Sequence, residues 1–358
     1  MKKYIVFCFC LFCFVLIFNS CQNSFLKKWQ LPEHFGQQFS IPKDNPMNKD
    51  AVFLGKMLFF DVRLSADNTI SCATCHQPQK SFSDNNKIAI GINQQINERN
   101  SMSLVNLLWN QNFFWDGRSP SLEHQSLHPL TNPKEMGMNI NDLEKKLQNI
   151  STYPPLFKKA FATSKINIDL IAKALAQFER TLISANSRYD KIVRGEVKPT
   201  LREKKAIQLF FTHPIAEINL RGANCGDCHG SHLTTLQTFH NNGLDKEPKD
   251  TGLEKITKKS TDRGKMKAPS LRNIALTAPY MHDGRFQNLE QVLDHYNEHI
   301  QSSNSLDILI NEATNIPEGK TLSLTKEEKQ DIILFLNMLT DSTFIQNPAF
   351  QNPFLQKK

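Results

Sequence analysis

The pattern Cys-x-x-Cys-His occurs twice in this chain of 358 residues. The two copies comprise Cys72, Cys75 and His76, and Cys225, Cys228 and His229. Two thiols at this spacing attach a haem through its vinyl groups, and the adjacent histidine binds the iron from one face. A zinc half-site or a redox-active dithiol also uses paired cysteines, but neither requires a histidine directly after the second one. We therefore expect two covalently bound haem c groups.

The N-terminus has the composition of an export signal. Two lysines precede an apolar run from Tyr4 to Phe18, which is too short and wrongly flanked for a permanent transmembrane helix. A small residue then precedes Cys21, as in a bacterial lipoprotein signal. We expect residues 1–20 to be removed and Cys21 to be lipidated, which would anchor the protein on the periplasmic side of a bacterial membrane. An ordinary cleaved signal is the alternative.

The cysteine count and the charge pattern argue against structural disulfides and against a nucleic-acid partner. Of eight cysteines, three lie in the signal, four belong to the paired motifs and the last is Cys21. None remains for a structural disulfide, although an exported protein could form one. The formal charge is +8, but the chain has no basic stripe with interleaved aromatic residues, so we expect no nucleic-acid partner.

The sequence around the first motif is repeated around the second. A segment ending in two phenylalanines precedes each motif, at 55–60 and 206–211. Each motif is followed by an Arg-Asn pair and then by an Asp-Gly-Arg signature, at 114–118 and 281–285. Matched features in the same order indicate a duplication, and we expect two cytochrome c-like haem domains with a pseudo-twofold relation.

The fold class is predicted to be mainly α. Apolar residues recur at helical spacing over 168–184 and 326–339, and Thr325 with Glu328 forms a predicted capping box for the second helix. Strand alternation is scarce, and the long irregular stretches 68–100 and 233–269 are expected to wrap the haems.

These patterns divide the chain into five expected segments. They are a signal over 1–20, a linker from the lipid anchor over 21–45, an N-terminal haem domain over 46–186, a C-terminal haem domain over 187–341 and an extended tail over 342–358.

The paired motifs and signatures, together with the segment Ala268-Pro269-Ser270-Leu271-Arg272-Asn273, resemble the bacterial di-haem cytochrome c peroxidases. That family includes the MauG-like enzymes. The resemblance runs from about Pro46 to Leu339. It implies that the N-terminal haem reacts with hydrogen peroxide and that the C-terminal haem receives electrons from an external donor. It also implies His76 and His229 as the proximal iron ligands.

Three residues fall in the family's register for peroxide chemistry. Trp115, Gln125 and Glu135 stand ten residues apart, which implies an inter-haem tryptophan, an active-site glutamine and a catalytic glutamate. Glu135 would act as the acid and base that moves a proton between the peroxide oxygens, and Pro129 would pack over the distal face. Taken alone, the same residues could be a loop carboxylate, a helix-surface amide and a core aromatic.

The N-terminal haem is expected to have an open distal face. In many relatives a loop histidine closes that face until the enzyme is reduced, and the corresponding position here is near Ile92. No histidine occurs between His76 and His124. Binding of His124 or His128 over the iron is the alternative.

The second haem departs from the common peroxidase pattern. Tyr296 stands at a position where classical peroxidases have a methionine and MauG-like enzymes have a tyrosine. The resemblance to the MauG-like enzymes implies a phenolate ligand, which stabilises high oxidation states of iron. The competing ligands are Met281, Met266, His295 and His299. The resemblance also implies a calcium ion between the haems, bound by Asn100, Thr277 and Pro279 through hard oxygen atoms.

Three functions compete at this point. The first is a periplasmic peroxidase that draws electrons from a small cytochrome c or a cupredoxin. The second is MauG-like oxidation of a protein substrate through a high-valent state, although Ala223 stands where the protein-facing tryptophan of that enzyme would be. The third is a non-enzymatic electron carrier or peroxide sensor. The resemblance also allows a homodimer.

Overall fold

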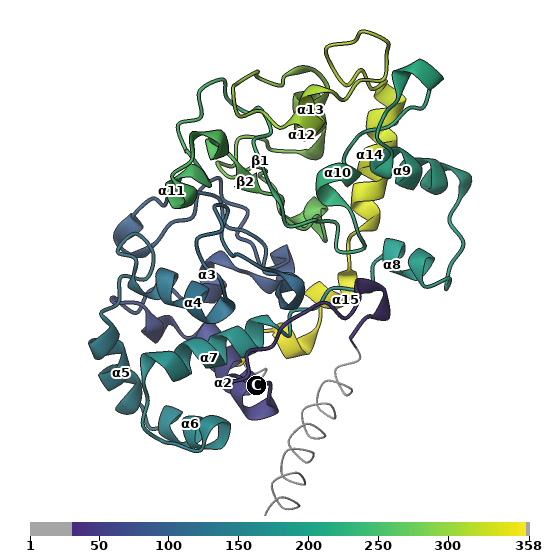
Figure 1. Ribbon diagram of the computed structural model, residues 1–358. Helices are drawn as coiled ribbons and strands as arrows, with labels where there is room; N and C mark the ends of the chain where they lie inside the picture. Colours follow the sequence, from purple (N-terminus) through teal and green to yellow (C-terminus); the bar gives the residue numbers. More distant parts are fainter. Residues whose placement is uncertain (1–30, 356–358) are drawn as a thin grey trace, which may run out of the picture.

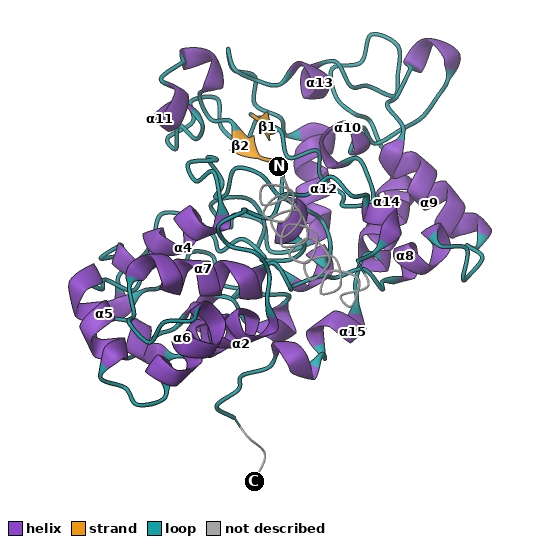
Figure 2. Cartoon of the chain, turned by 60° about the horizontal axis from the view of Figure 1, so that its bottom comes forward, coloured by secondary structure: helices purple, strands orange, loops and turns teal. Residues whose placement is uncertain are grey.

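The computed structural model describes residues 31–355, and in this range the protein is mainly helical with one short two-stranded sheet (Figure 1, Figure 2). The predicted signal and the lipidated Cys21 lie outside the described residues. Two helical halves are visible in Figure 1. The N-terminal half contains the first cysteine motif and the C-terminal half contains the second.

The N-terminal half is built around one pair of helices. Its helices are α2 (Lys49–Phe60), α3 (Cys72–Cys75), α4 (Leu122–Thr131), α5 (Ile140–Gln148), α6 (Tyr153–Phe161) and α7 (Ile168–Glu179). Helix α2 packs against α7, and α4 and α6 flank them. The core between them is aromatic, since Phe59 and Phe178 are fully buried with ring centroids 5.2 Å apart. Aromatic pairs of this geometry add to the stabilisation that comes from burial alone.

The C-terminal half repeats this plan. Its helices are α8 (Arg188–Val193), α9 (Leu201–Phe211), α10 (Gly226–His229), α11 (Glu254–Thr257), α12 (Leu289–Glu298), α13 (Ile308–Asn311) and α14 (Lys326–Met338). Helix α14 packs against α9, and Phe210 and Phe335 are buried between them with ring centroids 4.6 Å apart. The capping box of Thr325 and Glu328 is confirmed. Strands β1 (Phe239–His240) and β2 (Met266–Lys267) pair antiparallel in a long loop.

Short 3-10 helices interrupt the connecting loops. They are η1 (Glu33–Phe35), η2 (Val62–Leu64), η3 (Pro78–Lys80), η4 (Ile92–Gln94), η5 (Leu107–Trp109), η6 (Ala216–Ile218), η7 (Ser260–Asp262), η8 (Ile274–Leu276) and η9 (Pro348–Phe350).

The duplication is visible at atomic detail in the two Asp-Gly-Arg signatures. Each forms a turn, at 113–119 and 280–286, whose first residue donates a backbone hydrogen bond of 2.7 Å to the last. In both turns the arginine pairs with the aspartate two positions earlier, at 3.0 and 2.7 Å. Gly117 and Gly284 have φ angles of 71° and 62°, a left-handed conformation that favours glycine. Each turn leads into the helix that follows it, α4 or α12.

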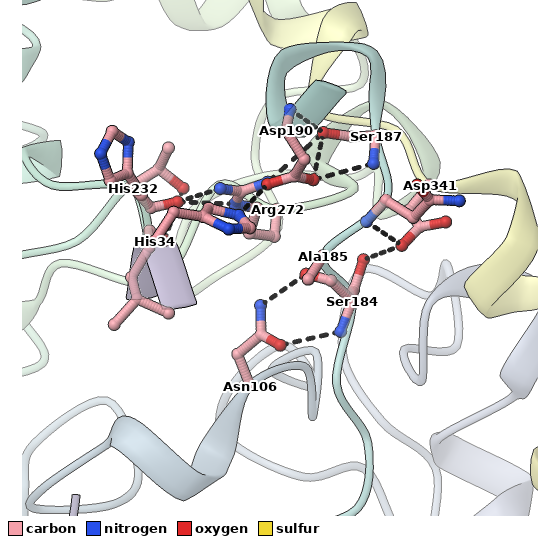
Figure 3. Close-up of polar contacts among 12 residues, drawn as sticks. His34, Asn106, Ser184, Ala185, Ser187, Asp190, His232, Arg272 and Asp341 are labelled. Atoms are coloured by element: carbon pink, nitrogen blue, oxygen red, sulfur yellow. Dashed lines mark hydrogen bonds and ion pairs between the residues drawn. The ribbon is translucent and has the colours of Figure 1, made fainter. Parts of the chain in front are cut away.

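A buried polar network joins the segment before α2 to the C-terminal half (Figure 3). The Arg272 guanidinium donates to Asp190 at 2.6 Å, and both side chains are completely buried. His34 Nε2 donates to the same carboxylate at 2.8 Å. The neighbouring ion pair with Arg272 and the hydrogen bonds from His34 and Ser187 hold the pKa of Asp190 far below its usual range, against the effect of burial.

A second network lies at the crossing between the halves (Figure 3). Asn106 and Ser184 exchange hydrogen bonds of 2.8 and 3.1 Å. Asp341 accepts from the Ser184 hydroxyl at 3.2 Å, and its own backbone N–H donates to Asn273 at 2.7 Å. These contacts fix the positions of two chain segments that follow α7 and α14.

The structure differs from three expectations about local conformation. The helix expected over 168–184 ends at Glu179, and Arg180, just beyond it, pairs with Glu123. Part of the predicted linker is packed, since Phe35 is buried against Trp109. The predicted extended tail contains α15 (Ser342–Ile345) and η9, because two of its phenylalanines are buried in the core of the N-terminal half.

Candidate haem cavity and catalytic site

One continuous cavity of about 780 Å³ connects the two cysteine motifs. The first motif opens onto it from the N-terminal half and the second from the C-terminal half. The site residues predicted from the sequence all line this cavity: Cys72, Cys75, His76, Asn100, Trp115, Gln125, Glu135, Cys225, Cys228, His229, Thr277, Pro279 and Tyr296. The long loops 68–100 and 233–269 contribute much of the wall.

Both motif histidines are oriented to bind a metal through Nε2. His76 Nδ1 donates to the carbonyl oxygen of Phe82 at 2.9 Å, and His229 Nδ1 contacts the carbonyl oxygens of Pro269 and Thr234 at 3.1 and 3.3 Å. Burial lowers the pKa of both imidazoles, that of His229 to about 4, so both are neutral. A neutral imidazole whose Nδ1–H is fixed by a carbonyl is the usual arrangement of an iron-binding histidine. The cavity walls therefore fit two haems.

No second histidine faces the cavity from the described N-terminal half. Ile92 is buried, and its side chain packs against Gly137 rather than lining the cavity. His124 and His128 also lie outside the cavity wall, with ring centroids 4.9 Å apart, and His124 Nδ1 contacts the Ser119 hydroxyl at 3.0 Å. Neither imidazole is therefore placed to bind an iron opposite His76.

Glu135 lines the same cavity from the turn after α4. Asn97 Nδ2 donates to Glu135 Oε1 at 2.6 Å. Burial raises the pKa of the Glu135 carboxyl, while the hydrogen bond from Asn97 and the charge of Arg118 act in the opposite direction. A carboxyl with a raised pKa in a cleft is suited to both accepting and donating a proton near neutral pH.

The loop that carries Asn97 is locked to the loop that carries Glu135. The Ile92 N–H donates to the carbonyl oxygen of Glu135 at 2.9 Å. A Cβ atom at Gly91 would lie 2.0 Å from the Lys134 carbonyl oxygen, so only glycine allows this approach. These contacts fix the backbone of Glu135 against this loop, and the hydrogen bond from Asn97 holds its carboxyl.

Gln125 and Pro129 line the cavity from the same helix, α4. The Oε1 atom of Gln125 is buried and accepts no hydrogen bond from the described residues. Since buried polar atoms in proteins are nearly always paired, this amide is positioned to bind a molecule inside the cavity.

Trp115 lies where the two halves meet. Its Nε1–H donates to the carbonyl oxygen of Asn100 at 2.9 Å, and its ring centroid lies 6.5 Å from that of His282. Its backbone carbonyl accepts from Lys267 at 2.8 Å. The indole is therefore held by contacts from both halves.

The structure separates the candidate ligands of the second iron. Tyr296, Met281 and Met266 line the cavity, whereas His295 and His299 do not. His295 Nε2 instead donates to the carbonyl oxygen of Asn242 at 3.0 Å.

The Tyr296 hydroxyl has a single hydrogen-bond partner among the described residues, and this partner is neutral. The hydroxyl accepts from Asn242 Nδ2 at 3.0 Å. Burial raises the pKa of this phenol, and the hydrogen bond from Asn242 opposes the shift. A bound cation would be needed to stabilise the phenolate in this environment.

The three predicted calcium ligands all line the cavity. Asn100 donates through Nδ2 to the carbonyl oxygen of Asn86 at 2.8 Å, which leaves its Oδ1 atom free. Within residues 31–355, no donor occupies the Asn100 Oδ1 atom or the carbonyl oxygens of Thr277 and Pro279. Uncharged oxygen atoms of this kind fit calcium.

Comparisons with known proteins agree with this arrangement. Residues 49–198 match the family model of di-haem cytochrome c peroxidases. The chain is 36% identical to the methylamine utilization protein MauG of Methylorubrum extorquens over 83% of this chain and 80% of that protein. It is 33% identical to the cytochrome c551 peroxidase of Nitrosomonas europaea over 87% and 84% of the two chains.

The chain belongs to the di-haem cytochrome c peroxidase and MauG family. Among solved structures, a MauG-like protein associated with microbial copper homeostasis matches with a TM-score of 0.81 and 33% identity, over 91% of this chain and 99% of that chain. Membership of a di-haem family and the two attachment motifs together establish two haem c groups as the cofactors. From residue 31 to residue 355, no helix is long and apolar enough to cross a membrane.

Two residues of this di-haem site were missed by the sequence analysis. Asn97 and Asn242 hydrogen-bond to Glu135 and Tyr296, respectively. Each comes from a loop far from its partner in sequence, and neither belongs to a motif, so no local signal could have identified it.

Proposed function

We propose that this protein reduces hydrogen peroxide to water, using electrons from a small cytochrome c or a cupredoxin. The observation that carries the proposal is the buried Glu135 carboxyl, held by Asn97 in a cavity whose N-terminal side presents no second histidine. An electron carrier needs no acid and base beside its haem, and it gains nothing from an open iron face. The relatives named as peroxidases support the same activity.

The haems, when bound, would supply the redox chemistry, and the protein supplies proton transfer and positioning. Glu135, as a carboxylate, would accept a proton from one oxygen of a peroxide molecule in the cavity and return it to the other oxygen, which would leave as water. Gln125 binds peroxide through its unpaired Oε1 atom. Trp115, held between the halves, is the proposed route for electrons from the second haem.

Two further assignments accompany this proposal. A calcium ion bound by Asn100, Thr277 and Pro279 would hold the loops of both halves beside Trp115. Lipidation at Cys21 would keep the protein on the periplasmic side of a membrane, where small redox proteins are available as donors.

Steady-state peroxide reduction with a reduced small cytochrome c or cupredoxin as donor tests the function. The oxidised protein should react without prior reduction, and Glu135→Gln should lower turnover by about 10²–10⁴-fold, the usual contribution of general acid–base catalysis. Haem content should be unchanged. Glu98→Gln is a suitable control, because Glu98 also lines the cavity but pairs with Lys134 at 3.1 Å. Near-normal turnover in Glu135→Gln would exclude this mechanism.

MauG-like oxidation of a protein substrate is the second candidate, and Tyr296 is the observation that favours it. A phenolate at the second iron would lower the potential of that haem and help it to share oxidising equivalents with the first. In that case, peroxide alone should produce a long-lived state in which both haems are oxidised beyond the ferric level. Absorption and electron paramagnetic resonance spectra would detect this state. Tyr296→Met should abolish that state. Rapid oxidation of cytochrome c by the native protein, with no such state, would leave the peroxidase assignment standing.

A further inference from the structure

Lys267 is a buried basic residue in the wall of the haem cavity. Its side chain is at the end of β2 and only 4% of the residue is exposed. The ammonium donates to the carbonyl oxygens of Gln111 and Asn112 at 2.5 and 2.9 Å. Both acceptors belong to the N-terminal half, so Lys267 joins the halves. An ammonium has three donors, and these two bonds use only two of them.

Lys267 differs from the other basic residues of the cavity in having no carboxylate partner. Arg99 pairs with Asp116, Arg118 with Asp116, Lys134 with Glu98 and Lys255 with Asp250. Within the described residues no carboxylate reaches Lys267, and burial alone lowers its pKa to about 8. Buried charges in proteins are normally paired, because an uncompensated one is costly. The Phe113 ring, whose centroid lies 5.8 Å from the ammonium, offsets part of this charge, but no anion among the described residues neutralises it.

The position of Lys267 indicates where that anion comes from. Its backbone N–H donates to the carbonyl oxygen of Trp115, and Pro269, two residues later, accepts from the proximal histidine of the second haem. The backbone of Lys267 thus lies between Trp115 and the second haem motif, and its ammonium reaches the carbonyl groups of the N-terminal half. Each haem carries propionate carboxylates, and these are the anions that enter this cavity with the cofactors.

We propose that Lys267 binds a haem propionate where the two halves meet. A charge-assisted hydrogen bond to the propionate would use the third donor of the ammonium and neutralise its charge. Because a nearby positive charge favours the reduced form of a haem, Lys267 would also raise the reduction potential of the haem it contacts. This inference rests on haem binding alone, so it holds for either candidate activity.

Spectroelectrochemical titration of the matured holoprotein tests the proposal with a readout other than activity. Lys267→Gln removes the charge but keeps donors for the two carbonyl groups. It should shift one haem to a lower midpoint potential and change the propionate-bending band in the resonance Raman spectrum. Lys267→Arg keeps the charge and should retain both properties. Lys255→Met is the matched control, because this cavity lysine is already paired with Asp250.

Two results would overturn the proposal. One is a Lys267→Gln protein that carries two haems and has unchanged potentials and an unchanged propionate band. The other is an equal shift in Lys255→Met, which would indicate a general effect of charge. An experimental structure of the wild-type holoprotein is decisive without any variant: Nζ within hydrogen-bond distance of a propionate oxygen supports the proposal, and Nζ bound only to carbonyl oxygens and water refutes it.

Discussion

Glu135 is placed where two opposing influences set its protonation. Burial favours the neutral acid, and the hydrogen bond from Asn97 favours the carboxylate. As the base that takes a proton from peroxide, Glu135 must start ionised. Peroxide turnover should therefore fall as the pH drops through the raised pKa of this group.

Asn97→Leu should move that acidic limb to higher pH. The variant removes a hydrogen bond that stabilises the carboxylate, so the pKa of Glu135 rises further. Turnover at high pH should change much less than turnover at low pH. The measurement is the pH dependence of kcat/KM for peroxide, with Gln95→Leu, an exposed residue of the same loop, as control. An unshifted acidic limb would mean that another group controls it.

At the scale of elements, the buried pair of Arg272 and Asp190 ties a loop of the second half to the start of α8. Replacing one partner leaves the other charge buried, which typically costs about 3–5 kcal/mol. Arg272→Met should lower the free energy of unfolding by an amount in this range, measured by denaturant titration of the holoprotein. Haem content reports whether the variant has matured.

A pair with an exposed arginine provides the comparison for this prediction. Arg202 pairs with Asp331 at 2.7 Å; the Arg202 side chain is 61% exposed, and the buried Asp331 keeps a second partner, Lys205, at 3.2 Å. Pairs whose charges remain accessible to water usually contribute about 0–1 kcal/mol. Arg202→Met should therefore have little effect on unfolding. If the two variants lost similar amounts of unfolding free energy, the burial of Arg272 would not determine how much its ion pair stabilises the protein.

Elements with a local signal were predictable from the sequence, and elements stabilised by distant contacts were not. The capping box of α14 was predictable because its residues are neighbours along the chain. The early end of α7 has no local signal, because apolar spacing continues past Glu179 to Leu182. The short helix α15 is too brief to have a periodicity of its own and is held by burial of Phe344. Asn97, the hydrogen-bond partner of Glu135, lies in an irregular loop. Residue spacing in such a loop does not indicate which side chains meet.

At the scale of the whole molecule, the proposed calcium ion lies between residues of both halves. Removing it with a chelator should lower the temperature of unfolding, and adding calcium back should restore it. A ligand present at one hundred times its Kd stabilises the folded state by about 2.7 kcal/mol. Magnesium should substitute poorly, because it demands a smaller octahedral site. Asn100→Leu should unfold at one temperature with or without calcium. Unfolding that does not respond to the chelator would contradict the site.

The number of haems is also a property of the whole molecule. Because both motifs open onto one cavity, the matured protein should contain two haems per chain, measured by the pyridine haemochrome method against protein mass. Cys225→Ala with Cys228→Ala should leave one covalent haem. A ratio near one in the wild-type protein, after production with a competent maturation system, would contradict the assignment.

The two phenylalanines of the tail complete the hydrophobic core of the first half around Phe82. These two residues come at the end of the chain, after the entire second half. The first half therefore lacks two of the aromatic contacts of Phe82 until residue 350 has joined the folding chain. A chain truncated after α14 would leave the Phe82 ring without these contacts, and we expect proteases to cleave it more readily than the full chain.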